Sequence, residues 1–238
     1  MVSRYGGVSL AADKKRLTYA KCLNDFKEEL DVAVSAIPPE KAIEADYQII
    51  GPALEDAKYC ADKQSLRNMF TNLISRTLNS DTTSMVHPSF SGIIKQMNPL
   101  DAENLSILAK GPAPIAEYRA MRISSSYRVL QTNVFLENPR QQDIYIQSVS
   151  LSALAQLGLV ELHYHTRVSD GTGNVSNKFY GKFSHTELYH HFCSTFISPT
   201  PKDGFQKPRD NLLVREVKAV PGRACISPLG ASFAKICL

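Results

Sequence analysis

The sequence predicts an α+β protein, mainly α, in which an N-terminal helical bundle precedes a winged-helix-like α/β module. Apolar residues recur every three or four positions through the first hundred residues, as in amphipathic helices. Gly111-Pro-Ala-Pro114 then marks a boundary, because Gly-Pro and Ala-Pro stop a helix and begin an extended segment. Beyond it, Leu154-Ala-Gln-Leu-Gly-Leu-Val160 is typical of a helix that enters a strand through a capping glycine. We therefore expect two domains, residues 1–111 and 112–238.

Three longer helices are expected in the first domain, over residues 13–37, 40–62 and 63–78. Pro38 and Pro39 end the first of them, because the residue before a proline avoids the helical conformation. Gly51-Pro52 is expected to kink or break the second helix, because proline lacks an amide donor and clashes one turn back.

The segment Met85–Leu105 predicts two short helices joined at a sharp corner, each opening on a proline, Pro88 or Pro99. Asn98 is a suitable N-cap before Pro99, and Asp101 places negative charge in the first turn. The corner is expected to serve mainly as a packed structural element. His87 is expected to cap the first of these helices or to pack, and the alternative is a contact or switch residue.

The second domain is expected to begin with two strands, over residues 118–123 and 127–136. A helix near residues 144–157 should end at Gly158 in a left-handed conformation and lead into a strand over 159–168.

The remainder of the second domain contains an enlarged insertion, residues 169–210, followed by a wing and a terminal helix. A helix over residues 183–196 is expected there, capped at Ser184 with Glu187 as its capping-box partner. A hairpin is expected across Val220-Pro-Gly222, because Pro-Gly favours a turn, with strands over 212–219 and 223–226. The chain then closes with a helix that begins at Pro228, with Leu229, Phe233 and Ile236 facing inward.

Composition limits the classes of function. The net charge is +4, with 27 basic residues interspersed among 23 acidic ones, so nucleic-acid binding is permitted but not favoured. No apolar run of about 18 residues occurs, and the N-terminus lacks a signal-peptide core, so we expect a cytoplasmic protein. The five cysteines are scattered and form no CxxC pair, which argues against a zinc ribbon or a disulfide framework.

No reactive centre can be assigned from the sequence. There is no Gly-x-Ser-x-Gly elbow, no Walker loop and no Gly-x-Gly-x-x-Gly word. Glu216-Val-Lys218 has the local form of a nuclease motif but no upstream acid to accompany it. We therefore predict no catalytic residue and no cofactor.

The histidines are the residues to consider as metal ligands. His163 and His165 alternate on one expected strand and should share a face. The other donors that could join them lie nearby in the sequence: Glu161, His185, Glu187, His190, His191 and Cys193. Surface histidines beside an insertion are the favoured interpretation, and no metal is predicted.

A series of short words resembles the Abi-alpha (abortive infection alpha) family of bacteria. These words are Val86-His-Pro-Ser-Phe90, Ile93-Ile-Lys-Gln-Met97, Pro99-Leu-Asp-Ala102, Leu157-Gly-Leu-Val160 and Ser227-Pro-Leu-Gly-Ala-Ser-Phe233. With Ile37-Pro-Pro39 and the apolar spacing of Leu66–Ile74, the resemblance covers most of residues 13–238. Family members often carry a Gly/Ala-rich segment before the first long helix, of which only Tyr5-Gly-Gly7 remains here.

The resemblance implies a role in bacterial defence against phage by abortive infection, and it brings no catalytic residues with it. We expect a non-enzymatic interaction or effector protein that binds a protein partner or itself. Its motif and interaction candidates are His87, Pro88, Phe90, Pro99, Asp101 and Gly158.

Two alternatives remain open. The first is a winged-helix DNA-binding regulator, for which Arg119, Arg122 and Arg128 are the candidate nucleic-acid contacts. The near absence of Lys and Arg from residues 144–157 weakens it, because phosphate neutralisation dominates DNA affinity. The second and weaker alternative is a metal-dependent hydrolase built on the histidines.

Overall fold

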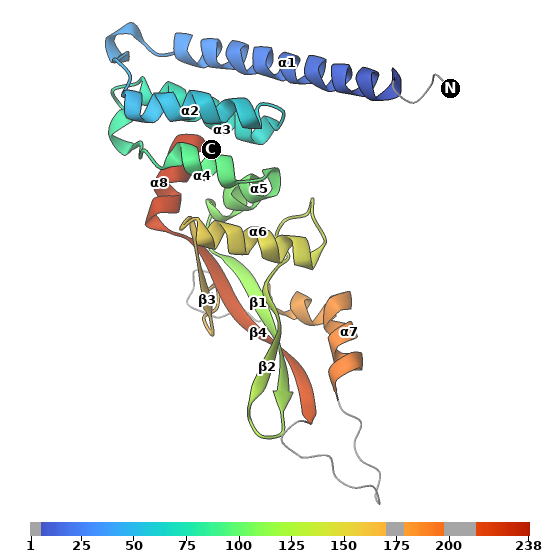
Figure 1. Cartoon of the computed structure of the whole chain (residues 1–238). Helices are drawn as coiled ribbons and strands as arrows, with labels where there is room; N and C mark the ends of the chain where they lie inside the picture. The colour runs from blue at the N-terminus through green and yellow to red at the C-terminus, as the bar shows by residue number, and fades with distance from the viewer. Residues whose placement is uncertain (1–5, 170–178, 198–212) are drawn as a thin grey trace, which may run out of the picture. The chain divides into compact units, whose positions relative to one another are not determined.

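The structure, a computed structural model, describes residues 6–169, 179–197 and 213–238 (Figure 1). The fold is mixed α+β, with helices throughout and one four-stranded antiparallel sheet. The chain divides into two compact units, residues 1–102 with 231–238, and residues 103–230. The expected division at residue 111 stays a prediction, and so does the winged-helix-like arrangement.

The first unit is helical. Its helices are α1 (Gly6–Ser35), α2 (Tyr47–Cys60), α3 (Gln64–Thr77) and α4 (Phe90–Gln96), with short 3-10 turns at Pro39–Lys41 and Thr83–Met85. Two further helices, α5 (Pro99–Leu108) and α8 (Pro228–Cys237), contribute residues to both units. Within the first unit, α1 packs on α3, and α2 packs on both α3 and α4.

The expected helix over residues 40–62 is shorter than predicted and is not broken at Pro52. It begins at Tyr47, because the Asp46 carboxylate accepts a hydrogen bond from the Gln48 amide at 2.9 Å and caps the first turn. Pro52 lies inside α2, within its first two turns. Its missing amide therefore removes one hydrogen bond close to the helix start, and the helix continues to Cys60.

The core of the first unit is built from large side chains that are almost completely buried. They are Leu66, Met69, Phe70 and Leu73 of α3, Phe90 and Ile94 of α4, and Phe233 and Ile236 of α8. The Phe90 and Phe233 rings meet edge to face, with their centroids 5.2 Å apart. The inward orientation predicted for Phe233 and Ile236 is confirmed, and the last helix closes the core of the N-terminal bundle.

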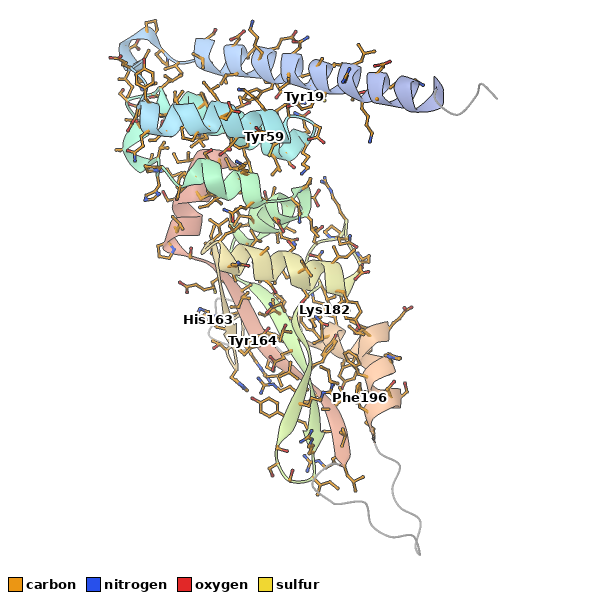
Figure 2. All side chains as sticks on the ribbon, viewed as in Figure 1. Tyr19, Tyr59, His163, Tyr164, Lys182 and Phe196 are labelled. Atoms are coloured by element: carbon orange, nitrogen blue, oxygen red, sulfur yellow. The ribbon has the colours of Figure 1, made fainter. Side chains whose placement is uncertain are left out.

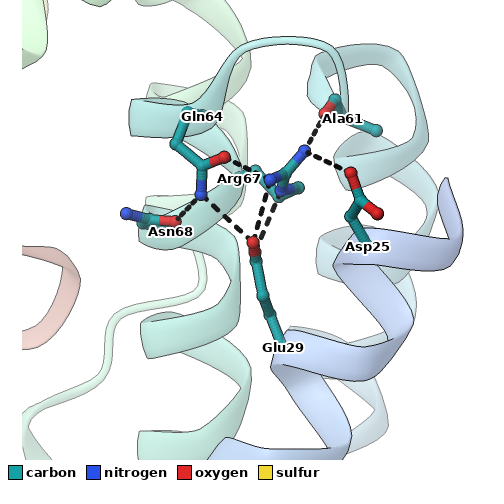
Figure 3. A network of polar contacts seen from close by, with 6 residues as sticks. All are labelled: Asp25, Glu29, Ala61, Gln64, Arg67 and Asn68. Carbon is teal, nitrogen blue, oxygen red and sulfur yellow. Dashed lines mark hydrogen bonds and ion pairs between the residues drawn. The ribbon is translucent and has the colours of Figure 1, made fainter. Parts of the chain in front are cut away.

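A buried arginine holds α1 against α3 (Figure 3). Arg67 is 7% exposed, and its Nε and Nη2 donate to the two carboxylate oxygens of Glu29 on α1, at 2.9 and 2.8 Å. Its Nη1 donates to the Ala61 carbonyl at 3.0 Å, beyond the end of α2. The hydrogen bonds from Arg67 lower the pKa of Glu29, because they stabilise the ionised carboxylate. One guanidinium therefore joins α1 to the segment between α2 and α3.

The second unit is organised around the sheet. Its strands are β1 (Ala113–Arg122), β2 (Tyr127–Phe135), β3 (Val160–Tyr164) and β4 (Val214–Ile226), in the order β2-β1-β4-β3. Two helices accompany it, α6 (Ile144–Gln156) and α7 (Glu187–Phe196), and a 3-10 turn over Gly181–His185 precedes α7.

The two helices cover opposite faces of the sheet (Figure 1). Val134 belongs to a buried cluster with Tyr118, Phe183 and Phe192, on the face that α7 covers. The neighbouring residue, Asn133, instead donates to Ser152 of α6 at 2.8 Å. On β1, Tyr118 points to the α7 face, so its neighbour Glu117 points to the other face. Tyr164 lies near Glu117 and bonds to Asn133, which places α6 on that other face.

The predicted hairpin across residues 220–222 is wrong, because β4 is one continuous strand that pairs with β1 on one side and β3 on the other. Pro221 is tolerated because its carbonyl, which accepts from the His165 amide at 2.9 Å, faces the side where β3 has already ended. Its missing amide therefore costs no hydrogen bond to β1. Gly222 is needed for close approach, since a Cβ there would lie 2.8 Å from the His163 carbonyl oxygen.

The helix expected over residues 183–196 begins later than predicted and has a different cap. Gly181–His185 forms the 3-10 turn, and α7 starts at Glu187 with Thr186 as its N-cap. The Thr186 hydroxyl accepts from the Tyr189 amide at 3.1 Å, whereas the Ser184 hydroxyl donates to the Gly181 carbonyl at 2.8 Å. The Ser184 hydroxyl therefore bonds within the 3-10 turn and does not cap α7. Most of the remaining expected insertion lies outside the described residues.

Candidate functional site

The corner residues of the first unit make local contacts. His87 and Pro88 are exposed, and α4 begins at Phe90, two residues later than the sequence predicts. The His87 ring closes the turn, because its Nδ1 accepts from the Ser89 amide at 3.1 Å. Phe90 is fully buried in the bundle core.

Pro99 is the first residue of α5, as predicted. A reciprocal capping box surrounds it. The Asp101 amide donates to the Asn98 side chain at 3.0 Å, and the Asn98 amide donates to the Asp101 carboxylate at 2.8 Å. Asp101 is 1% exposed. This geometry gives Pro99 and Asp101 a direct structural role at the start of α5.

Gly158 ends α6 with a φ of +73°, which a residue with a Cβ rarely adopts. The Leu159 amide donates to the Leu154 carbonyl at 3.0 Å and the Gly158 amide to the Ala155 carbonyl at 3.0 Å, which closes the last turn. The chain then enters β3 at Val160, so Gly158 sets the angle between α6 and the sheet.

The three arginines proposed for nucleic-acid contact do not share one face. Arg119 is 8% exposed, is paired with Glu117 and lies over the Tyr127 ring, 4.2 Å from its centroid. Arg128 lies over Phe196 of α7, at 5.9 Å, on the other face of the sheet. Arg122, at the end of β1, is partly exposed.

A buried polar cluster around Arg119 was not found by sequence reasoning. Its guanidinium donates to Glu117 and approaches His165 Nε2 at 3.3 Å. Nearby, the Tyr164 hydroxyl accepts from the Asn133 amide at 2.8 Å, and desolvation raises the pKa of Tyr164 to about 12. In the sequence, Glu117 and Arg119 are two positions apart on an extended segment, and this spacing could have indicated an ion pair on one face of a strand. With its guanidinium held by Glu117 and stacked on a ring, Arg119 is not a ready phosphate ligand.

The predicted common face for His163 and His165 is wrong. β3 ends at Tyr164, and His165 has a φ of +63°, which breaks the strand alternation. His163, labelled in Figure 2, lies opposite Arg223 in the register of β3 and β4, and its Nε2 bonds to Glu161 at 3.2 Å. His165 instead contacts Arg119 of β1, on the opposite face. Among the residues that the structure describes, no three His, Cys, Asp or Glu side chains are grouped closely enough to hold a metal ion.

Helix α6 has an unusual distribution of polarity. Its buried face includes the polar residues Gln147, Ser148 and Ser150 as well as Leu151 and Leu154. Its outward face carries three large apolar residues, Tyr145, Ile146 and Val149, which are 54%, 47% and 67% exposed. The helix contains no charged residue.

Buried hydrogen bonds fix α6 in this orientation. Asn104, which is fully buried, donates to Gln147 at 2.8 Å and to Ser150 at 2.9 Å. Its Oδ1 accepts from Asn138 at 2.9 Å, so both of its N–H donors and its carbonyl oxygen have partners. The Ser148 hydroxyl also donates to the Thr132 carbonyl of β2 at 2.9 Å. Rotating α6 to bury its apolar residues would break these bonds, and buried polar groups are costly to leave unpaired.

The outward face of α6, defined as Tyr145, Ile146 and Val149, is therefore the candidate functional site. Exposed apolar residues that are held in place by the fold mark contact surfaces for other apolar surfaces. The sequence signal was the run of apolar and uncharged residues after Asp143, which alone does not tell which face is buried. No helix in the described ranges has the length and hydropathy required to cross a bilayer. The cytoplasmic location stays a prediction.

These features define a two-unit α+β protein with an exposed apolar face on α6. Residues 18–237 match the family described as abortive infection alpha, and the chain belongs to this family. No curated protein matches the sequence. A solved structure of an uncharacterized protein from the hydrocarbon-degrading marine bacterium Alcanivorax borkumensis SK2 is similar over 66% of this chain and 94% of that one, with 14% identity and a TM-score of 0.32. Membership of the family indicates a role related to abortive infection.

Proposed function

We propose that the protein acts in bacterial anti-phage defence as a non-enzymatic effector, through contact with another protein. Family membership across residues 18–237 supports the defence role. The observation that carries the mode of action is the outward face of α6, where Tyr145, Ile146 and Val149 are exposed on a helix without charge. An apolar protein surface is the partner chemistry that such a face fits.

Phage challenge tests this proposal directly. Cells expressing the chain should form fewer plaques and should lose viability after infection, compared with cells carrying an empty vector. Val149→Asp places a charge in the middle of the apolar face, so it should abolish the protection while leaving the protein folded. Unchanged plaque counts across a broad phage panel would remove the defence role.

A matched control separates loss of contact from loss of folding. Gln156 is exposed on the same side of α6 but lies at its last residue, two turns and about 10 Å along the helix from Val149. Gln156→Asp adds the same charge and should protect as the wild-type chain does. If Val149→Asp also protects fully, the α6 face is not the contact surface.

A winged-helix DNA-binding regulator is the second candidate. The supporting observation is that α6 passes through Gly158 into the antiparallel pair of β3 and β4, as a helix enters a wing. Duplex binding at low salt tests it. Tight binding that weakens steeply as salt rises would favour the regulator over the effector, because that slope measures phosphate contacts.

A further inference from the structure

Helix α1 has an outward face that the first unit leaves uncovered. Phe26 is buried against the bundle. Tyr19, labelled in Figure 2, lies on the side of α1 that faces α2, and its hydroxyl donates to the Lys58 carbonyl at 2.6 Å. At about 100° per residue, Leu17 lies on the opposite side of the helix from Phe26. Leu17 and Val32 are 72% and 71% exposed. Large apolar residues therefore stand at both ends of a face turned away from the bundle.

Five exposed residues define this outward face of α1: Leu17, Lys21, Asn24, Glu28 and Val32. Their spacing of three or four positions places them within a stripe about 80° wide. Within the described residues, neither Lys21 nor Glu28 makes an ion pair or a side-chain hydrogen bond. The stripe thus offers two apolar contacts and two unpaired charges of opposite sign.

The charges of α1 are segregated along its length. Residues 13–21 carry four basic side chains and one acidic one, and residues 22–35 carry four acidic side chains and one basic one. Local stability does not explain this order, because helices favour acidic residues near the start and basic residues near the end. It also places like charges four or fewer residues apart, as at Glu28 and Asp31.

We propose that the outward face of α1 binds the same face of a second copy of the chain, with the two helices antiparallel. If Leu17 lies opposite Val32 of the second copy, then Lys21 lies opposite Glu28, and Asn24 lies beside the two-fold axis. Each contact occurs twice, as a two-fold interface requires. The basic half of each helix then faces the acidic half of the other.

This register uses every residue of the stripe. Leu17 and Val32 cover each other at the two ends, about 22 Å apart along each helix. Lys21 and Glu28 form two ion pairs inside those ends. The Asn24 amides can donate to each other near the axis, and a central Asn is known to fix the register of paired helices. A parallel arrangement would instead place like charges together.

The α1 face is a second contact surface, distinct from the outward face of α6, and its pairing rests on the proposed function only for its biological role. Sedimentation velocity of the purified full chain, from about 5 to 300 μM, tests it without phage. Wild-type protein should show a monomer–dimer equilibrium. Wild-type protein that stays monomeric over this range would overturn the pairing, while the plaque assay would judge the defence role separately.

Charge reversal identifies the register. Lys21→Glu and Glu28→Lys each place like charges opposite one another twice, so each should raise the dimer Kd about thirtyfold. Mixing the two single variants should restore association. In a mixed dimer, the acid introduced at position 21 of one chain faces the base introduced at position 28 of the other, and the native Glu28 and Lys21 face each other. The double variant should associate as the wild type does.

A control on the same helix completes the design. Lys15 is exposed but lies on the far side of α1 from the stripe. Lys15→Glu should leave the dimer Kd unchanged, within about twofold. If the single reversals and the mixture all associate like the wild type, the antiparallel α1 pairing is wrong. Circular dichroism of each variant confirms folding, and the mixing result cannot arise from misfolded chains.

Discussion

Replacing Arg67 should release α1 from the rest of the first unit. Arg67→Met keeps most of the buried stem but removes the guanidinium that bonds to Glu29 and to the Ala61 carbonyl. Hydrogen bonds to charged groups contribute about 1.5–3 kcal/mol each. Breaking a fully buried ion pair costs about 3–5 kcal/mol. The Glu29 side chain is 33% exposed, so water can replace part of the lost contact. We therefore expect the low end, a loss of about 3 kcal/mol.

Hydrogen exchange detected by mass spectrometry is the suitable assay, because it reports the opening of α1 and α3 separately from the second unit. Amides in the second half of α1 should lose protection in Arg67→Met, and those in the sheet should not. Lys27→Met is the matched control, because it also replaces a basic residue by methionine, but at an exposed position of α1. Protection of α1 that stays within about 0.5 kcal/mol of wild type would refute the reasoning.

The pH dependence gives an independent check. The pKa of Glu29 is lowered in the folded chain, mainly by its hydrogen bonds from Arg67. The stabilisation is therefore fully present above the ordinary carboxyl pKa, and it is lost as the pH falls through the lowered pKa of the folded state. A double-mutant cycle of Arg67→Met with Glu29→Gln should give a coupling of about 1–2 kcal/mol at neutral pH. That coupling should shrink when the carboxylate is protonated.

Three further predictions concern the second unit and its junctions. Asn104→Leu leaves Gln147, Ser150 and Asn138 without their buried partner, so urea unfolding should show a loss of about 3 kcal/mol, whereas a loss below about 1 kcal/mol would contradict the network. Gly230→Ala places a Cβ 2.0 Å from the Leu159 carbonyl oxygen, so the free energy of unfolding should fall by about 3 kcal/mol or more. In the control Gly92→Ala, the new Cβ in α4 meets nothing within 4 Å, so the melting temperature should not fall. Tyr164 should ionise near pH 12 in an absorbance titration, because desolvation raises its pKa; its contribution to stability is complete below about pH 10 and is lost as the pH rises towards 12. Ionisation of every tyrosine near pH 10 in the folded chain would contradict this.

Local chemistry let the sequence determine several elements. Asn98, Pro99 and Asp101 specify the start of α5 by themselves, because a capping box needs only residues within one turn. Gly158 likewise specifies the end of α6, since a left-handed residue favours glycine. The helices over most of the first unit follow from apolar spacing, and so does the inward face of α8.

The predictions that were wrong concern segments whose local sequence is compatible with two structures. Pro221-Gly222 is compatible with a turn, but the pairing of β4 with both β1 and β3 makes it the middle of a strand. Ser184 and Thr186 can both cap a helix, and the 3-10 turn that occupies Ser184 leaves Thr186 as the cap. The conformation of Pro221-Gly222 is decided by pairing with β1 and β3, which lie far away along the chain. The start of α7 is decided by the 3-10 turn that precedes it.

The sequence by itself determined the start of α5 and the end of α6, because capping residues, proline and glycine act over a few residues. Only the tertiary structure decided which face of α6 is buried, because both faces of this uncharged helix carry apolar residues. The hydrogen bonds from Asn104 to Gln147 and Ser150 select the buried face. The same holds for α1, whose stripe of exposed residues becomes visible only when Phe26 and Arg67 fix the opposite face against the bundle. Burial is a property of packed elements, and periodicity along one element does not determine which side its neighbours cover.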